Sequence, residues 1–163
     1  LKIEGRTKSH YYVARTAQVY RRAIDDAVAG RPFDMRLMDE LDNLANRGYT
    51  EGFYRRHVHD EYQNYERGHS IGVHQQFVGE IRDYDPERGV LEIDVKNRFE
   101  VGDGVELMLP GGNRRFTLSH IENRRGESVS AAPGSGHVMR IPVPGEAIPE
   151  ERIAYALLMR DLP

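Results

Sequence analysis

The hydrophobic residues of this 163-residue chain change their period once, close to Gln75. Before that point apolar side chains recur every three or four residues, which is the spacing of an amphipathic helix. After it apolar and polar residues alternate, as in Leu91 to Lys96, and this pattern is typical of strands with one face in water. The chain is therefore predicted to be of the α+β class, with helices in residues 1–74 and a sheet in residues 75–163.

Capping residues delimit two predicted helices in the first part. Ser9 is placed to cap a helix whose apolar stripe ends at Gly30, and glycine commonly terminates helices. Pro32 prevents that helix from continuing. Asp34 is placed to cap a second helix, which the apolar spacing carries to Gly48. Start and stop signals are therefore present for both helices.

Residues 50–74 link the two parts. A short helix is predicted over 50–56, and residues 57–74 have no clear period, so we predict an ordered connector there. The connector carries four histidines, namely His57, His59, His69 and His74. Imidazole and carboxylate groups suit zinc or iron, but this spacing is not diagnostic of a metal site. We predict no metal here, and hydrogen-bonded or surface histidines instead.

Short strands alternate with turn-forming residues after Gln75. Strands are expected over 76–81, 91–96, 105–109, 115–121, 128–131, 138–143 and 153–159. Turns rich in glycine, proline, asparagine or aspartate fall at 85–89, 110–113, 123–126 and 133–136. In the first strand, Phe77, Gly79 and Ile81 are expected to share one face. Six or seven strands at this spacing predict a small closed antiparallel barrel.

Composition excludes several classes of protein. No apolar run approaches the roughly 20 residues that cross a bilayer, so no membrane association is expected. Cysteine is absent, so the chain contains no disulfide, thiolate nucleophile or cysteine-bound cluster, and a reducing, cytoplasmic location is expected. The net charge of −3 argues against a uniformly basic nucleic-acid binder. No serine, histidine and acid set forms a recognisable nucleophilic triad, so no residue is assigned a catalytic role.

Several segments together resemble the C-terminal part of the collagenase-like peptidase family. They are residues 2–6, 8–9, 11–12, 49–53, 63–65, 75–80, 101–103 and 155–160. The resemblance covers essentially the whole chain and implies an upstream barrel of the triosephosphate-isomerase type. Leu1 to Gly5 would be its last strand, and the helices would complete it. The residues agree, because Leu1 to Ile3 forms a strand-like segment with no partner within reach.

Some members of that family hydroxylate RNA, and the resemblance implies hydroxylation of a tRNA uridine at the wobble position. The partners would be tRNA and the upstream barrel domain of the same protein. The resemblance also implies an iron–sulfur cluster, with cysteine ligands upstream of Leu1, and a need for prephenate; no cofactor is expected in this chain. Two alternatives remain open. The sheet part can belong to a collagenase-like peptidase, or it can be a structural or oligomerisation module without substrate contact.

Glu4, Arg6 and Lys8 form the first candidate binding group. They would lie at the C-terminal end of the last barrel strand, where such barrels gather phosphate and substrate groups. Arg6 and Lys8 can hold a phosphate or a carboxylate such as that of prephenate, and Glu4 can orient an arginine or a substrate hydroxyl. The alternative is a set of salt bridges that closes the barrel.

A second candidate group lies in the sheet part. It consists of arginines at predicted hairpin ends, Arg114, Arg115, Arg124 and Arg125. These side chains can reach RNA phosphates and give binding that weakens with salt. Residues 75–163 carry 11 basic and 15 acidic side chains, so a solvated charged surface is the alternative. The tyrosines Tyr62, Tyr65 and Tyr84 are candidates for stacking on bases, or for buried contacts between the two parts.

Overall fold

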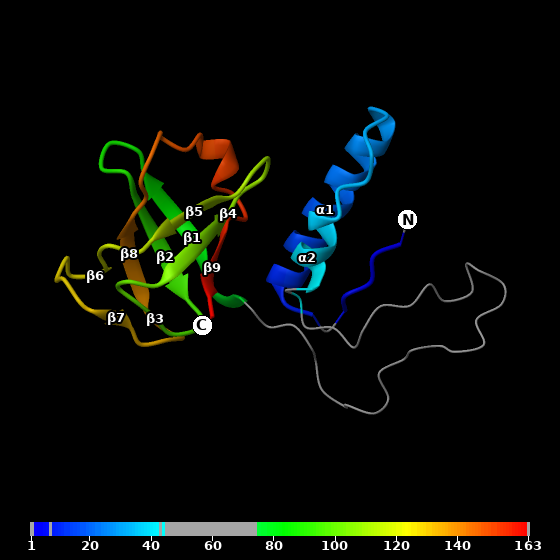
Figure 1. The fold of residues 1–163 in the computed structure, drawn as a ribbon. Helices are drawn as coiled ribbons and strands as arrows, with labels where there is room; N and C mark the ends of the chain where they lie inside the picture. The colour runs from blue at the N-terminus through cyan, green and yellow to red at the C-terminus, as the bar shows by residue number, and fades with distance from the viewer. Residues whose placement is uncertain (1, 7, 43, 45–74, 163) are drawn as a thin grey trace, which may run out of the picture. The chain divides into compact units, whose positions relative to one another are not determined.

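The computed structural model describes residues 2–6, 8–42, 44 and 75–162 (Figure 1). The chain divides into two compact units, Leu1–His74 and Gln75–Pro163, and each is described by itself. The first contains helices and the second antiparallel strands, as the α+β prediction requires. In the part that the structure describes, no helix is long and apolar enough to span a membrane.

Helix α1 spans His10–Val28 and begins and ends where its capping residues predict. The Ser9 hydroxyl accepts a hydrogen bond from the Tyr12 backbone N–H at 3.3 Å. At the other end Gly30 adopts a φ of 67°, and its N–H donates to the Ala27 carbonyl at 3.1 Å. The Arg31 N–H donates to the Asp26 carbonyl at 2.8 Å. These two bonds form a Schellman motif, in which glycine is favoured because it adopts positive φ without strain.

Helix α2 spans Arg36–Asp42, and the Asp34 carboxylate accepts from the Arg36 backbone N–H at 3.0 Å. The helix ends earlier than its predicted end at Gly48, and residues 45–48 lie outside the described part. The predicted helix at 50–56 and the connector with its four histidines lie outside it as well.

A charged network joins α1 to α2. The Arg15 side chain is only 1% exposed, and its Nη1 lies 3.0 Å from Glu40 Oε2. Arg22 contacts the other carboxylate oxygen of Glu40 at 3.0 Å. The Arg15 guanidinium also lies 5.6 Å from the centre of the Tyr11 ring. Glu40 therefore holds two guanidinium groups of α1 from its position on α2.

Residues 2–5 do not form the strand that the sequence predicts at the N-terminus. A strand is stable only when its N–H and C=O groups are paired, and the described residues provide no partner strand for this segment. The prediction that the segment belongs to an upstream barrel stays a prediction.

The second unit is a curled sheet of seven antiparallel strands in the order β5-β4-β9-β1-β2-β8-β6 (Figure 1). The strands are β1 Gln75–Asp85, β2 Val90–Val95, β4 Gly104–Met108, β5 Arg114–Thr117, β6 Glu122–Asn123, β8 Val138–Pro142 and β9 Leu157–Asp161. Strands β3 (Phe99–Glu100) and β7 (Ala131–Ala132) form a separate pair, and a 3₁₀ turn, η1, spans Glu150–Arg152. The predicted closed barrel is not formed, because β5 and β6 remain the two edges of the seven-stranded sheet.

Three of the predicted strands are shortened or displaced. The strand expected over 115–121 ends at Thr117. The strand expected over 128–131 is reduced to an isolated bridge at Ser128 and to the two residues of β7. The strand expected over 153–159 begins only at Leu157. The η1 turn follows Pro149, and Tyr155 has a φ of 66°, so the chain before Leu157 cannot continue an extended strand.

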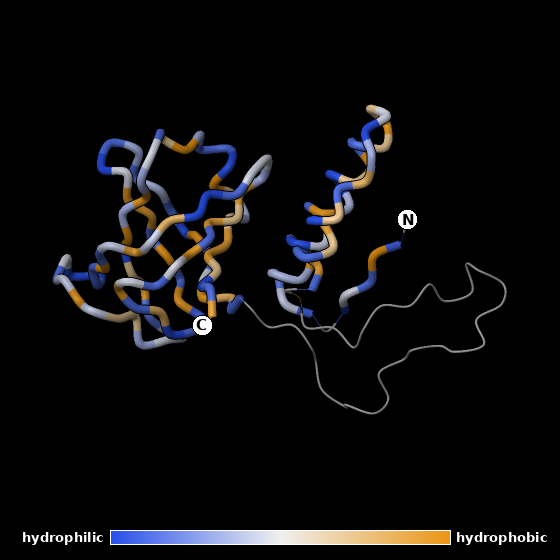
Figure 2. The backbone as a smooth tube through the Cα atoms, viewed as in Figure 1, coloured by the Kyte–Doolittle hydropathy of each residue, from blue (hydrophilic) through white to orange (hydrophobic). Residues whose placement is uncertain are grey.

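The core of the sheet unit lies on the inner face of the curl, where hydrophobic segments of several strands meet (Figure 2). Leu91, Ile93 and Val95 of β2 are fully buried, as their alternation predicts. In β1 the register shifts between Phe77 and Gly79, and Val78 is fully buried in the core while Phe77 is only half-buried. The expectation that Phe77 shares a face with Gly79 and Ile81 was therefore wrong, because a β-bulge interrupts the alternation.

Candidate functional site

The first candidate group, which consists of Glu4, Arg6 and Lys8, lies in the segment that leads into α1. The Lys8 N–H donates to the Gly5 carbonyl at 2.9 Å, which folds the chain back before the helix. A Cβ at Gly5 would lie 2.9 Å from the Tyr12 ring, so only glycine fits without a shift of that ring. The Lys8 ammonium lies 5.5 Å from the centre of the same ring. Tyr12 therefore positions both the turn and the Lys8 charge.

Glu4 and Arg6 are exposed on the same segment. Glu4 contacts the Lys2 ammonium at 3.1 Å, so the partner that the structure gives it is a lysine rather than an arginine. Both side chains of this pair are mostly exposed, and such pairs contribute little to stability.

The N-terminal end of α1 is electropositive. No acidic residue lies in its first turn, and Arg6, Lys8 and His10 are close to it in sequence. The partial positive charge of a helix N-terminus adds to that of the side chains. This end of α1 thus has the residue types that hold a phosphate or a carboxylate.

The hairpin arginines of β5 are engaged within the sheet unit. Arg114 donates to the carbonyl oxygens of Pro144 at 3.1 Å and Glu146 at 2.9 Å, so it fixes the loop after β8. Arg115 lies 3.5 Å from Glu106, a carboxylate that is only 3% exposed. Glu106 also accepts from Gln75 at 2.9 Å.

Arg124 and Arg125 lie in the turn after β6, at the opposite edge of the sheet order. The Asn123 side chain shapes this turn, because it accepts from the N–H groups of Arg125 at 2.9 Å and Glu127 at 3.0 Å. Among the described residues neither arginine side chain makes a hydrogen bond or an ion pair, and both are exposed. Arg114 and Arg115 thus have partners within the fold, whereas Arg124 and Arg125 are available to contact a ligand.

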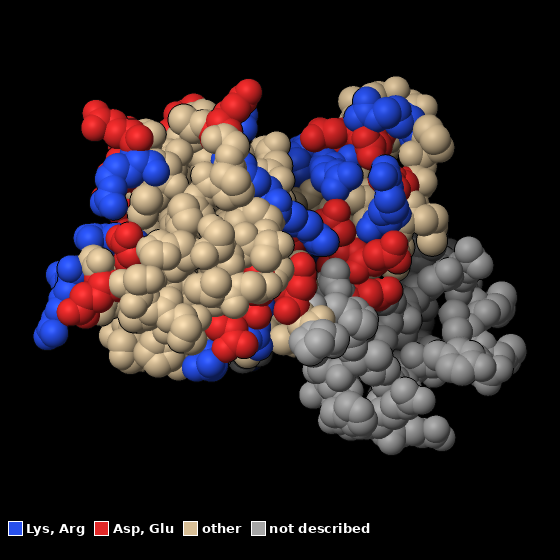
Figure 3. All heavy atoms as spheres, turned by 60° about the vertical axis from the view of Figure 1, so that its left-hand side comes forward, with Lys and Arg blue, Asp and Glu red and all other residues tan. Residues whose placement is uncertain are grey.

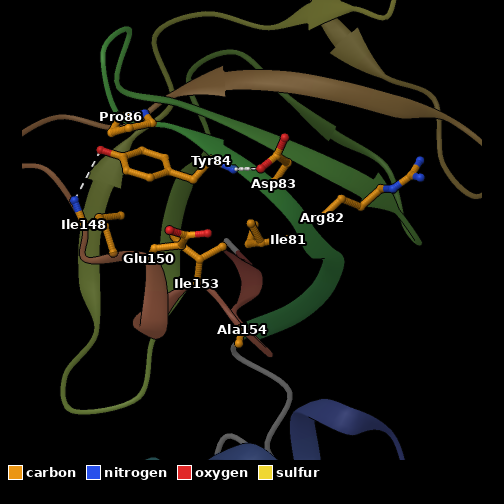
Figure 4. Close-up of a pocket in the computed structure, with 9 residues that line it drawn as sticks. All are labelled: Ile81, Arg82, Asp83, Tyr84, Pro86, Ile148, Glu150, Ile153 and Ala154. Atoms are coloured by element: carbon orange, nitrogen blue, oxygen red, sulfur yellow. Dashed lines mark hydrogen bonds between the residues drawn. The ribbon is translucent and has the colours of Figure 1, made fainter.

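A pocket of about 500 Å³ opens beside β1 (Figure 4). Of its lining residues, only Tyr84 was a candidate for function in the sequence. Its lining residues come from β1 and from the segment around η1, namely Ile81, Arg82, Asp83, Tyr84, Pro86, Ile148, Glu150, Ile153 and Ala154. The Tyr84 hydroxyl accepts from the Ile148 N–H at 3.3 Å, which ties the two segments together. The composition of the 148–154 segment alone gave no sign that it would lie beside β1.

A smaller pocket of about 220 Å³ shares Asp83 and Tyr84 with the first. Within it, Arg140 pairs with Glu92 at 3.1 Å. Arg88 lies 4.0 Å from Glu122. Both arginines of the smaller pocket therefore have an acidic partner.

The described residues form no group of three or more histidine or acidic side chains that could hold a metal ion. Charged clusters in the sheet unit are ion pairs instead. The Asp94 carboxylate, 2.9 Å from the Lys96 ammonium, raises the pKa of that lysine, and Glu80 acts in the same direction. On the face drawn in Figure 3, basic and acidic side chains of the described residues are interspersed.

Comparison with known proteins places these features in a family. Residues 1–64 match the family model of peptidase family U32, and residues 74–160 match that of the peptidase family U32 C-terminal domain. The crystal structure of the C-terminal domain of a Geobacillus thermoleovorans protein of the U32 peptidase type is 25% identical, with a TM-score of 0.46 over 53% of this chain and 93% of that chain.

Two curated relatives match almost the whole chain. The tRNA hydroxylation protein P of Haemophilus influenzae is 59% identical over 99% of this chain, and that of Escherichia coli is 57% identical over 99%. The chain spans 34% of the length of each of these relatives. The resemblance predicted from short segments is confirmed, and the chain belongs to peptidase family U32.

Proposed function

We propose that the protein to which this chain contributes modifies tRNA, and that the modification is hydroxylation of the wobble uridine. The observation that carries the proposal is the identity of 57–59%, over 99% of the chain, with two relatives named tRNA hydroxylation protein P. The chain covers about a third of those relatives, so its own contribution is proposed to be substrate binding rather than the chemical step.

Two groups of residues support a substrate-binding contribution. The electropositive end of α1, with Arg6 and Lys8, has the chemistry to hold a phosphate or the carboxylate of prephenate. Arg124 and Arg125 are exposed, and neither pairs within the described residues, so they are available for RNA phosphates. Arg114 and Arg115 would contribute less, because each already has a partner in the fold.

An iron–sulfur cluster in such a protein would need ligands from outside residues 1–163. The chain contains no cysteine, and thiolates are the usual ligands of these clusters. In this proposal residues 1–163 therefore take part in binding and positioning only.

The modification is tested on bulk tRNA. Nucleosides from cells with and without the gene are compared by mass spectrometry, and the deletion is complemented with the intact gene or with residues 1–163 alone. We expect hydroxyuridine derivatives to disappear on deletion and to return only with the intact gene. An unchanged nucleoside profile, with redundant genes also deleted, would contradict the proposal.

The binding contribution is tested with an unmodified tRNA transcript. Affinity of the purified chain is measured between about 50 and about 200 mM salt, and Arg124→Gln with Arg125→Gln is expected to reduce the salt dependence by up to about two phosphate contacts. Arg98→Gln is the matched control, because Arg98 is paired with Glu100 at 2.6 Å. Equal salt dependence in the double variant and the wild type would remove these arginines from the interface.

A peptidase is the second candidate function, because the matching family models carry that description. Cleavage of a collagen-like peptide by the intact protein, abolished when its barrel domain is altered, would favour it. In that case the wobble-uridine profile would not depend on the gene.

A further inference from the structure

The pocket of about 500 Å³ beside β1 is bordered by two backbone irregularities. The first is a β-bulge in β1, where Ile81 pairs with Ile93 but Asp83 pairs with Glu92, so that Arg82 is the extra residue. The second is Tyr155, which follows the lining residue Ala154 and is the only residue other than glycine with positive φ in the described part of the chain. Bulges and strained residues are concentrated at functional sites.

The rest of the fold does not offset the unfavourable backbone conformation of Tyr155. The residue is 94% exposed, and among the described residues its side chain makes no hydrogen bond or ring contact. A φ of 66° is unfavourable for an aromatic residue, and glycine or asparagine would adopt it more easily. Contact between the ring and a ligand in the neighbouring pocket would explain why an exposed tyrosine has this unfavourable backbone conformation.

Arg82 is the second unpaired group at this place. Its guanidinium extends away from the cluster of Tyr84, Ile148 and Ile153 (Figure 4). Within the described residues it makes no hydrogen bond or ion pair. The bulge thus presents a free cation at the rim of the pocket, where the phosphate of a bound nucleotide could lie.

The pocket combines apolar walls with acceptor groups on exposed residues. Ile81, Ile148 and Ile153 supply apolar contact, and Glu150 supplies a carboxylate. The Asp83 carboxylate lies apart from that of Glu150 and accepts from the Tyr84 N–H at 2.9 Å (Figure 4). Carboxylates accept hydrogen bonds and cannot donate them when ionised. They complement a planar ring whose edge carries neighbouring N–H donors, and among nucleobases guanine offers this at N1 and N2.

We propose that this pocket binds an unpaired guanosine of an RNA substrate. The base lies against the isoleucines with its donor edge toward the Glu150 carboxylate, Tyr155 stacks on the adjacent base, and Arg82 contacts the phosphate. The volume of about 500 Å³ lies within the range of pockets that hold small ligands. Splayed bases held by aromatic rings and hydrogen bonds are the usual mode of single-stranded RNA recognition. This inference rests on the proposed tRNA role.

The test uses the 163-residue chain and fluorescein-labelled RNA decamers, with anisotropy as the readout. One decamer has a single guanosine among uridines, and the other has inosine at that position, which lacks only the 2-amino group. We expect the guanosine probe to bind about five-fold more tightly or better, and Glu150→Gln to remove most of that preference. A wild-type chain that binds both probes equally would overturn the assignment of guanine.

Tyr155→Gly is expected to weaken binding of the guanosine probe about ten-fold, while Tyr155→Phe keeps the ring and the affinity. Arg82→Gln is expected to weaken binding and to lower its salt dependence by about one phosphate contact, and Arg98→Gln serves as the charge control. Equal affinities in the wild type and in Tyr155→Gly would overturn the role of the ring.

A tRNA transcript, measured in parallel, separates this inference from the proposed function. Wild-type binding to tRNA that none of the pocket variants affects would refute the pocket and leave the proposed function intact. No wild-type binding to tRNA at low salt would refute the pocket and the binding contribution proposed for this chain, whereas the modification itself is decided by the nucleoside profile. A change of sedimentation coefficient in Tyr155→Gly without a change in RNA affinity would identify the pocket as a contact between copies of the chain, against the inference.

Discussion

Replacement of Tyr155 by glycine should stabilise the sheet unit, although it removes an aromatic side chain. The φ of 66° costs a residue with a Cβ about 1–2 kcal/mol, and glycine avoids that cost. The residue is 94% exposed, so loss of the ring removes almost no buried apolar area. Glycine also makes the unfolded chain more flexible, which offsets roughly 0.4–1 kcal/mol. The net expectation is a gain of about 0.5–1 kcal/mol.

Two further variants isolate the backbone term. Tyr155→Ala keeps the Cβ and the strain, so its free energy of unfolding should stay within about 0.5 kcal/mol of the wild type. Ala154→Gly makes the same change from alanine to glycine one residue earlier, at an exposed position without positive φ. There glycine should destabilise by about 0.5–1 kcal/mol. The change from alanine to glycine is thus expected to raise the free energy of unfolding at position 155 and to lower it at position 154.

Differential scanning calorimetry measures these differences in the unfolding transition of the sheet unit. For a unit of this size, 1 kcal/mol corresponds to roughly 4–8 °C in Tm. If glycine lowers Tm relative to alanine at position 155, as it should at 154, then Tyr155 does not adopt positive φ in solution. The strain argument for a ligand-contacting ring would then be wrong.

Three other substitutions test the packing and the charge network. Glu40→Gln leaves the buried Arg15 guanidinium without its carboxylate and should lower the free energy of unfolding of the helical unit by about 2 kcal/mol. The control Asp39→Asn, at an exposed position, should change it by less than about 0.5 kcal/mol. Urea titration measures both. Gly79→Ala would place a Cβ 2.5 Å from Ile93 Cγ2, and we expect overpacking to cost about 2 kcal/mol; an unchanged denaturation midpoint would contradict this geometry. The hydrogen bond from the Arg36 side chain lowers the pKa of Asp34. At a pH above the ordinary carboxyl pKa, the ionised Asp34 therefore stabilises the fold. This stabilisation is lost as the pH falls through the lowered pKa. The stability difference between the wild type and Asp34→Asn should accordingly vanish in acid, and a difference that persists there would refute the pairing.

Local signals in the sequence were sufficient for the helices. Ser9 and Gly30 marked both ends of α1, because each capping interaction involves residues within one turn of the helix end. Asp34 marked the start of α2 for the same reason. The alternation in β2 was equally reliable, since Leu91, Ile93 and Val95 meet the core without interruption.

Irregular pairing between distant segments was not predictable in the same way. A bulge depends on how two strands far apart in sequence fit together, and nothing in residues 76–83 marks which residue is extra. The alternation therefore misplaced Phe77 and gave no sign of the bulge at Arg82. Tyr84 was the one pocket residue that the sequence named as a candidate for function, and its partner Ile148 lies 64 residues further along the chain.

The displaced start of β9 and the pocket have one common cause. Strand β9 pairs with β1 as far as Leu157 opposite Glu80, and the Ile81 N–H still bonds to the Ala156 carbonyl at 3.0 Å. A strand beginning at 153, as the hydrophobic pattern predicted, would continue this ladder and place position 155 opposite Arg82. The positive φ of Tyr155 turns the chain out of the ladder instead, and the bulge at Arg82 gives β1 an extra residue at the same level. The edge of β1 that β9 leaves unpaired is where Ile81 to Tyr84 line the pocket, so the two local departures from regular β-structure together create the space that we propose an RNA base occupies.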